Sequence, residues 1–86
     1  MGDYAHALGY NQSALRCMLS VNGENHLDTA YMYNNLGATY LGMEEYPQAL
    51  DHFMKAYAIS QRVLVPGHPF IQFLAGRIGL VKSKMQ

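Results

Sequence analysis

The four histidines are the side chains that most invite a search for chemistry, because imidazole is the commonest side-chain ligand for transition metals. His26 and His68 occupy equivalent helix starts, separated by 42 residues, and so belong to different parts of a repeat. His6 and His52 have no metal-ligating residue four positions away, as a ligand pair on one helical face would require. The sequence therefore predicts no metal site, and the histidines are interpreted as structural.

Cys17 and the adjacent pair Glu44-Glu45 are the other candidates for catalysis. A cysteine nucleophile needs a base and an oxyanion-forming loop, yet Cys17 lies in an apolar helical pattern with no glycine-rich loop beside it. Adjacent carboxylates in a turn are expected to be solvated, and Glu45 suits the positive end of the following helix. We therefore expect no catalytic residue, no cofactor and no enzyme activity.

Two amphipathic helices dominate the chain between residues 27 and 64. Apolar or small residues recur there at alternating spacings of three and four, which places them on one helical face. Gly42 is expected to take the left-handed conformation that ends a helix, and Pro47 suits the first turn of the next helix. The pattern predicts a helical hairpin whose interface buries Leu36, Gly37, Tyr40, Ala49, Phe53 and Ala56.

An internal repeat with an offset of 42 residues relates both ends of the chain to this hairpin. Such self-similarity at a fixed period indicates a helical repeat architecture, in which each unit buries its apolar face against its neighbours. The aligned pairs include Tyr4 with Tyr46, Ala7 with Ala49, Ala14 with Ala56, His26 with His68, and Gly37 with Gly79.

The repeat frame predicts a single all-α domain, residues 1–86, with antiparallel helices joined by short turns. Asn25 and Asp28 resemble a capping box at the start of one helix, and Pro66-Gly67 must end another. The expected helices lie near residues 3–21, 26–42, 46–64 and 69–84. In the repeat frame, residues 1–21 are the second helix of a first repeat, 27–64 a complete repeat, and 68–84 the first helix of a third.

The hairpin also carries a spaced pattern of large and small residues: Tyr33-x-x-Leu36-Gly37-x-x-Tyr40, then Ala49-x-x-x-Phe53, then Ala56. This pattern resembles the tetratricopeptide repeat (TPR), with Tyr33 where that family usually has tryptophan. Gln61 stands where the family has a closing proline, so the second helix is expected to run about two turns further. In this respect the chain resembles the long repeats of the kinesin-light-chain type. The resemblance implies an antiparallel helix-hairpin solenoid that binds another protein.

In TPR proteins the first helix of each repeat lines the concave surface, and kinesin-light-chain-like repeats often carry an Asn-Asn pair there, as this chain does. The resemblance implies that the pair contacts a partner. An amide both donates and accepts hydrogen bonds, so it can bind the backbone of an extended peptide. The alternative is that Asn35 bonds a loop or neighbouring helix internally. The expected partner-binding residues are Tyr31, Asn34, Asn35, Ala38 and Arg77.

A clamp for a C-terminal carboxylate, which some TPR domains build from several basic residues, is not expected. Phe73 and Gly76 occupy two positions in the last helix where a basic residue would help. Arg77 remains as a single cation, and one exposed charge contributes little against screening by salt.

The balance of charges excludes other classes of partner. Six basic residues offset six acidic ones, whereas binding to nucleic acid or to an anionic membrane depends on clustered Lys and Arg. The single cysteine favours a reducing compartment, and the sequence contains neither a secretory signal nor an apolar run of membrane-spanning length. We expect a soluble cytoplasmic scaffold or adaptor.

The alternative function is structural self-association without a separate ligand. An apolar band on the last helix is expected to lack a covering helix, so the isolated chain is expected to self-associate, by closed pairing if like surfaces meet. The band consists of Phe70, Phe73, Leu74, Ile78 and Val81.

Overall fold

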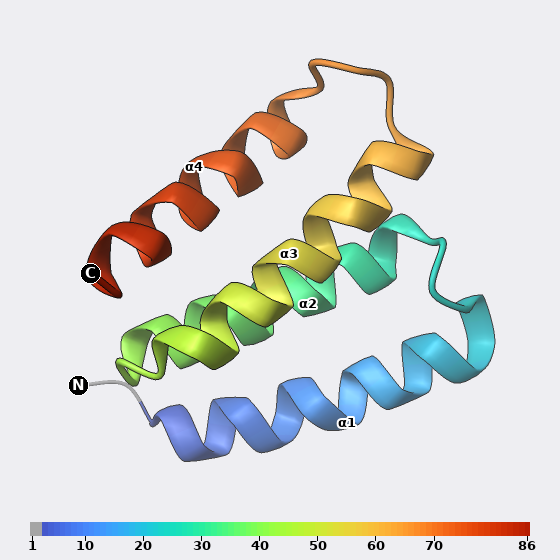
Figure 1. Cartoon of the computed structure of the whole chain (residues 1–86). Helices are drawn as coiled ribbons and strands as arrows, with labels where there is room; N and C mark the ends of the chain where they lie inside the picture. Colours follow the sequence, from blue (N-terminus) through green and yellow to red (C-terminus); the bar gives the residue numbers. More distant parts are fainter. Residues whose placement is uncertain (1–2) are drawn as a thin grey trace.

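The computed structural model describes residues 3–86 as consecutive antiparallel helices joined by short turns (Figure 1). The helices are α1 (Tyr4–Asn22), α2 (Leu27–Gly42), α3 (Tyr46–Val63) and α4 (Pro69–Lys84). α2 packs against α1 and α3, and α3 packs against α2 and α4. The predicted all-α fold is confirmed, and every helix begins and ends within one residue of its predicted range. The first two residues lie outside the described part of the chain.

Two histidines begin helices in the same way. Nδ1 of His26 accepts a hydrogen bond from the N–H of Asp28 at 3.1 Å, and Nδ1 of His68 accepts one from the N–H of Phe70 at 3.0 Å. Such a cap satisfies an N–H group that has no partner inside the helix. The shared geometry supports the 42-residue register between the two helix starts. The predicted break before α4 is also confirmed, since Gly67 has a φ of 83°.

Two predictions about the turns are wrong. Asn25 does not cap α2, because its Oδ1 accepts a hydrogen bond from Nε of Arg62 at 2.6 Å, which ties the first turn to the end of α3. Gly42 remains helical, and the left-handed conformation falls on Glu44, with a φ of 61°. Gly42 is required for close packing instead, since a Cβ there would lie 2.6 Å from the ring of Tyr4 on α1.

The core lies between α2 and α3 and extends to α4. The side chain of Phe53 is fully buried, and a Cβ added to Gly37 would lie 2.8 Å from its ring. A small residue on α2 therefore lets the aromatic ring of α3 approach the helix backbone, as the spacing predicted. Of the residues predicted for this interface, Tyr40 is half-buried and the others are buried.

The apolar band of α4 is better covered than the sequence predicted. Leu74 and Val81 are fully buried and belong to the core, while Phe70 and Ile78 are half-buried against it. Phe73 alone of the five is exposed, at 44%. The prediction that the whole band stays open is wrong, because the band is wide enough for α3 to cover part of it.

Within residues 3–86, none of the helices combines the length and the apolar character that crossing a membrane requires.

Candidate protein-binding surface

α2 presents four of the five predicted binding residues. Tyr31, Asn35 and Ala38 are exposed, and their spacings of four and three place them on one helical face. Asn34 lies beside this face and is half-buried. The backbone carbonyl of Asn35 accepts a hydrogen bond from Oγ1 of Thr39 at 2.9 Å, but its side chain bonds none of the described residues. The internal role considered for the Asn35 amide is therefore not found.

The side-chain oxygen of Asn34 is buried and accepts no hydrogen bond from any described residue. A buried acceptor without a donor costs on the order of 1–3 kcal/mol relative to a bonded one. The side chain as a whole is only half-buried, so rotation about its Cβ–Cγ bond can bring the oxygen toward solvent. Asn34 thus provides an acceptor that a donor from outside the chain can satisfy.

A row of aromatic rings joins α2 to α4. The rings of Tyr31 and Phe70 meet edge to face with centroids 4.9 Å apart, and those of Phe70 and Phe73 stack at 6.4 Å. The guanidinium carbon of Arg77 lies 4.9 Å from the centroid of Phe73. We call these four residues the aromatic row. Cation–π contact holds the arginine over the ring and leaves its N–H groups available to an acceptor.

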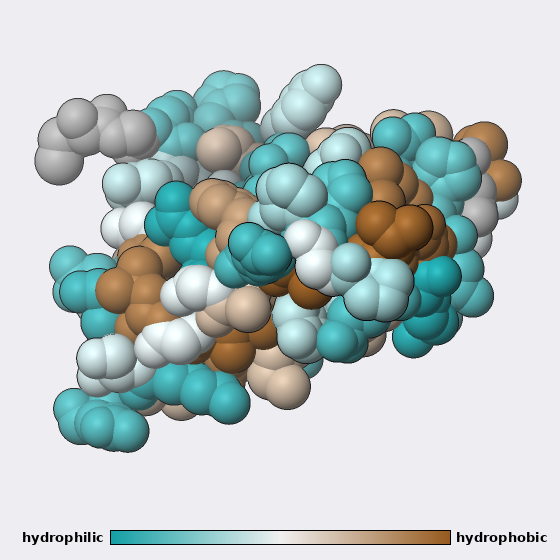
Figure 2. Space-filling model, turned by 90° about the horizontal axis from the view of Figure 1, so that it is seen from above, coloured by the Kyte–Doolittle hydropathy of each residue, from teal (hydrophilic) through white to brown (hydrophobic). Residues whose placement is uncertain are grey.

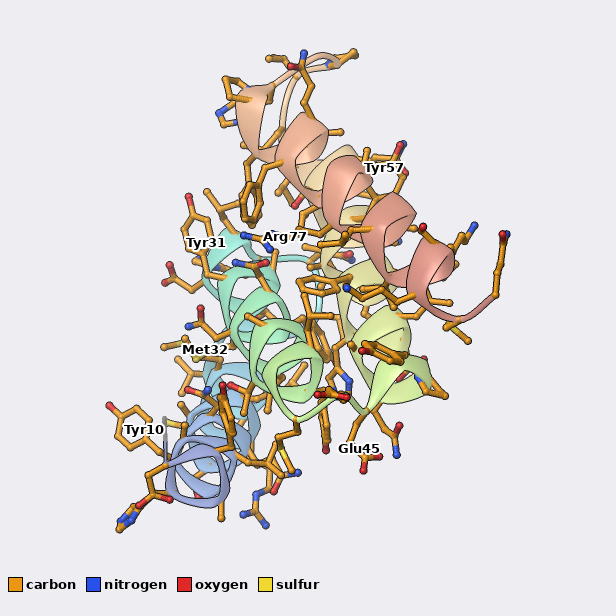
Figure 3. The ribbon with its side chains drawn as sticks, turned by 90° about the vertical axis from the view of Figure 1, so that its left-hand side faces the viewer. Tyr10, Tyr31, Met32, Glu45, Tyr57 and Arg77 are labelled. Carbon is orange, nitrogen blue, oxygen red and sulfur yellow. The ribbon has the colours of Figure 1, made fainter. Side chains whose placement is uncertain are left out.

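Figure 3 shows the two ends of the aromatic row on one flank of the molecule. Tyr31 comes from α2 and Arg77 reaches toward the same flank from α4, while Tyr57 lies on the other side of α4. The structure therefore brings together Tyr31 and Arg77, which the sequence placed on different repeats. The contact between them is indirect and passes through two phenylalanines.

Phe70 and Phe73 were missed as binding candidates. The sequence analysis assigned both to an apolar band and treated Phe73 as a position where a cation was lacking. The spacing of four between Phe73 and Arg77 was the available signal, because residues at that spacing meet on a helix surface. The contact between Tyr31 and Phe70 had no such local signal, since they lie on different helices.

Comparison with known families identifies the architecture. The sequence pattern of the tetratricopeptide repeat matches residues 1–69, which is most of the chain. The chain belongs to the tetratricopeptide repeat family. Comparisons with curated proteins and with solved structures give no match. TPR proteins are generally non-enzymatic helical scaffolds that mediate protein–protein interaction, so the family supports a surface made for another polypeptide.

The histidines of this TPR protein have structural contacts. His6 pairs with Asp3 at 3.2 Å, and His52 bonds the backbone oxygen of Gln48 at 2.8 Å. In the part of the chain that the structure describes, no three residues of the types His, Cys, Asp and Glu gather where they could hold a metal ion. These contacts support the interpretation of the histidines as structural.

A separate concavity lies between α3 and α4, away from the aromatic row. Its volume is about 290 Å³. It is lined by Tyr57, Gln61, Pro66, Gly67 and Ile71. Figure 3 shows Tyr57 on the side opposite to Tyr31, so the concavity and the predicted binding residues belong to different faces of the TPR protein.

Proposed function

We propose that this TPR protein is an adaptor that binds a segment of a partner protein across α2 and α4, on the concave side of the repeat. In this proposal Tyr31, Asn34, Asn35, Ala38 and Arg77 contact the partner. The repeats are of the long kinesin-light-chain-like type, with residues 1–21, 27–64 and 68–84 as successive repeat segments. The adaptor acts in the cytoplasm without a cofactor or a reaction of its own.

The observation that carries the proposal is the unpaired acceptor of Asn34. An extended peptide presents backbone N–H groups that have no partner within the peptide, and one of them can donate to this oxygen. The neighbouring amide of Asn35 is exposed and supplies both a donor and an acceptor. Binding would therefore replace an unfavourable buried group with a hydrogen bond, while the exposed amide anchors the backbone one position away.

The aromatic row supports contacts to side chains of the partner. Tyr31 is 42% exposed and Phe73 is 44% exposed, so both rings still have apolar surface to bury. Arg77 adds one positive charge over the second ring. Because the formal net charge of the chain is zero, long-range attraction contributes little to association. Affinities in the micromolar range or weaker are expected for so short a row.

Titration of a selected peptide tests the proposal. Short peptides displayed on phage are selected against the full chain, and the best one is titrated into ¹⁵N-labelled protein. Shift changes should cluster at the five proposed contact residues. The double variant Asn34→Ala, Asn35→Ala should weaken binding at least about tenfold, since it removes two polar contacts of about 1 kcal/mol each.

The matched control is Gln48→Ala, which removes an exposed amide from α3 instead. Its circular dichroism spectrum and peptide affinity should match those of the wild type. Shift changes confined to α1 and the outer surface of α3, or equal affinity of the double variant and the control, would contradict the proposal.

A second candidate function is self-association as a stacking unit. It is supported by the large apolar side chains exposed on the two outer helices, which include Tyr10 and Val21 on α1 and Phe73 and Leu80 on α4.

A further inference from the structure

α4 has the position of α2 in the repeat, but it has one helical neighbour fewer. α2 packs against α1 on one side and α3 on the other, whereas α4 packs against α3. The residues of α4 that correspond to the α1-facing side of α2 are covered: Val81 corresponds to Thr39, which Asn11 of α1 contacts at 3.4 Å. The residues that correspond to the α3-facing side are exposed. This open face comprises Gln72, Ala75, Gly79 and Lys82.

The glycine at the centre of the open face shows what kind of surface fits it. On α2, Gly37 receives the ring of Phe53, which would lie 2.8 Å from an added Cβ. The equivalent Gly79 has no atom within 4 Å of an added Cβ. The same small residue thus stands at the same register, with an intact seat for a helix and no side chain in it. The occupant that the repeat geometry fits is a helix equivalent to α3.

We infer that the open face of α4 binds α1 of a second copy of this chain. α1 is the register equivalent of α3, since it packs against α2 as α3 packs against α4. Docking of α1 onto α4 would therefore continue the largest interface of the fold from one copy to the next. The inference goes beyond the proposed binding of a partner peptide and uses other residues.

The side chains of α1 support this pairing. His52 on α3 contacts the rings of Tyr33 and Tyr40 on α2, with centroids 6.0 Å and 5.1 Å away. Its equivalent on α1 is Tyr10, which is 75% exposed. In the proposed pair the ring of Tyr10 would lie against Ala75 and Lys82, so that an apolar surface is buried and an ammonium group lies over an aromatic face.

The charges at the ends of the two helices are complementary. The backbone N–H of Glu45, at the start of α3, bonds the carbonyl of Tyr40 near the end of α2 at 2.9 Å. By the same register, Asp3 at the start of α1 would approach Lys82 of the other copy. Lys82 and Lys84 lie in the last turn of α4, and Asp3 precedes α1 as its N-cap. Opposite charges therefore face each other across the proposed contact.

This contact joins unlike surfaces, so each copy keeps one free α1 and one free α4. Such head-to-tail association continues from copy to copy and does not stop at a closed pair. It differs in this respect from the closed pairing that the sequence analysis favoured for like surfaces. Figure 2, which views the molecule from the α4 side, shows apolar patches separated by polar residues, and no single apolar face in this view favours pairing of like surfaces.

Sedimentation equilibrium of the full chain tests the inference over roughly 10–500 μM, because association follows mass action. The weight-average mass should rise continuously and pass twice the monomer mass. Gly79→Glu should restore the monomer mass at every concentration, since it fills the empty seat with a charged side chain. Ala75→Glu, on the same face, is a second variant in case the first does not fold by circular dichroism.

The matched control is Gly9→Glu. Gly9 is exposed on α1, also has no atom within 4 Å of an added Cβ, and corresponds to the solvent-facing Asp51 of α3. It adds the same charge and should associate like the wild type. A mass that stays monomeric or stops at a dimer, or a folded Gly79→Glu or Ala75→Glu variant that associates like the control, would overturn the inference. The Asn34→Ala, Asn35→Ala variant should leave the mass distribution unchanged, which separates this result from the peptide-binding proposal.

Discussion

α2 and α4 are equivalent helices in different surroundings. Both begin at a histidine cap and both carry a glycine at the same register, Gly37 and Gly79. Yet Gly37 is pressed against a buried ring, while Gly79 faces open space. The difference comes from the neighbours, since α3 covers that face of α2 and no described helix covers that face of α4. A repeat position therefore specifies which contacts a residue can make, and the adjacent helix decides whether it makes them.

The largest expected effect comes from truncating the two aromatic rings. Phe53→Ala should destabilise the fold by about 3–5 kcal/mol, because it leaves a cavity in the core between α2 and α3. A loss of that size is a large fraction of the stability of a small domain, so much of the protein should be unfolded. Phe73→Ala, at an exposed ring, should cost less than about 1 kcal/mol. Urea unfolding followed by circular dichroism measures both, and similar losses would mean that the two environments do not differ as described.

The paired glycines give the next largest effect. Gly37→Leu should cost about 1–3 kcal/mol or more, because its side chain overlaps the ring of Phe53. Gly79→Leu should cause no loss, since the site is open and leucine has a higher helix propensity than glycine by up to about 1 kcal/mol. Thermal unfolding at low protein concentration compares them without interference from self-association. Equal destabilisation would show that the face of α4 is already filled.

Much of this fold could be predicted from the sequence because its signals are local. The spacing of apolar residues determines the helices, and Pro47, Pro66 and Gly67 mark where they start and stop. The wrong predictions all involve contacts between distant residues. Asn25 looked like a cap, but Arg62 on α3 takes its side chain, and the adjacent His26 caps the helix in its place.

The candidate site was less predictable for the same reason. Asn34, Asn35 and Arg77 could be named from a family resemblance, but the aromatic row depends on how α4 lies beside α2. The contact of Tyr31 with Phe70 crosses between repeats and has no signature within either helix. The unpaired oxygen of Asn34 is also invisible in the sequence, since an amide at that position would be satisfied if one neighbour were a donor.

The histidine caps sharpen the comparison between α2 and α4 at a smaller energy. His26→Ala and His68→Ala should each cost about 1 kcal/mol, since each removes the acceptor for an N–H group in the first turn. Asparagine is a strong N-cap residue, so His68→Asn should recover most of the loss. Urea midpoints give the values. A negligible effect at His68 together with a normal one at His26 would indicate that the two helix starts are not equivalent.

The smallest effect is expected at Asn34, where stability and binding should change in opposite directions. Its equivalent on α4 is Gly76, which has no side-chain amide, so α2 alone carries the unpaired oxygen. Asn34→Leu replaces a buried acceptor with an apolar group of similar size and should stabilise the fold by up to about 1 kcal/mol. Asn35→Leu should bring no gain, because that side chain is exposed and its amide is already hydrated. Both variants should bind the selected peptide more weakly than the wild type. A loss of stability in Asn34→Leu would mean that the oxygen is satisfied in the free protein, and the main support for peptide binding at this position would then be removed.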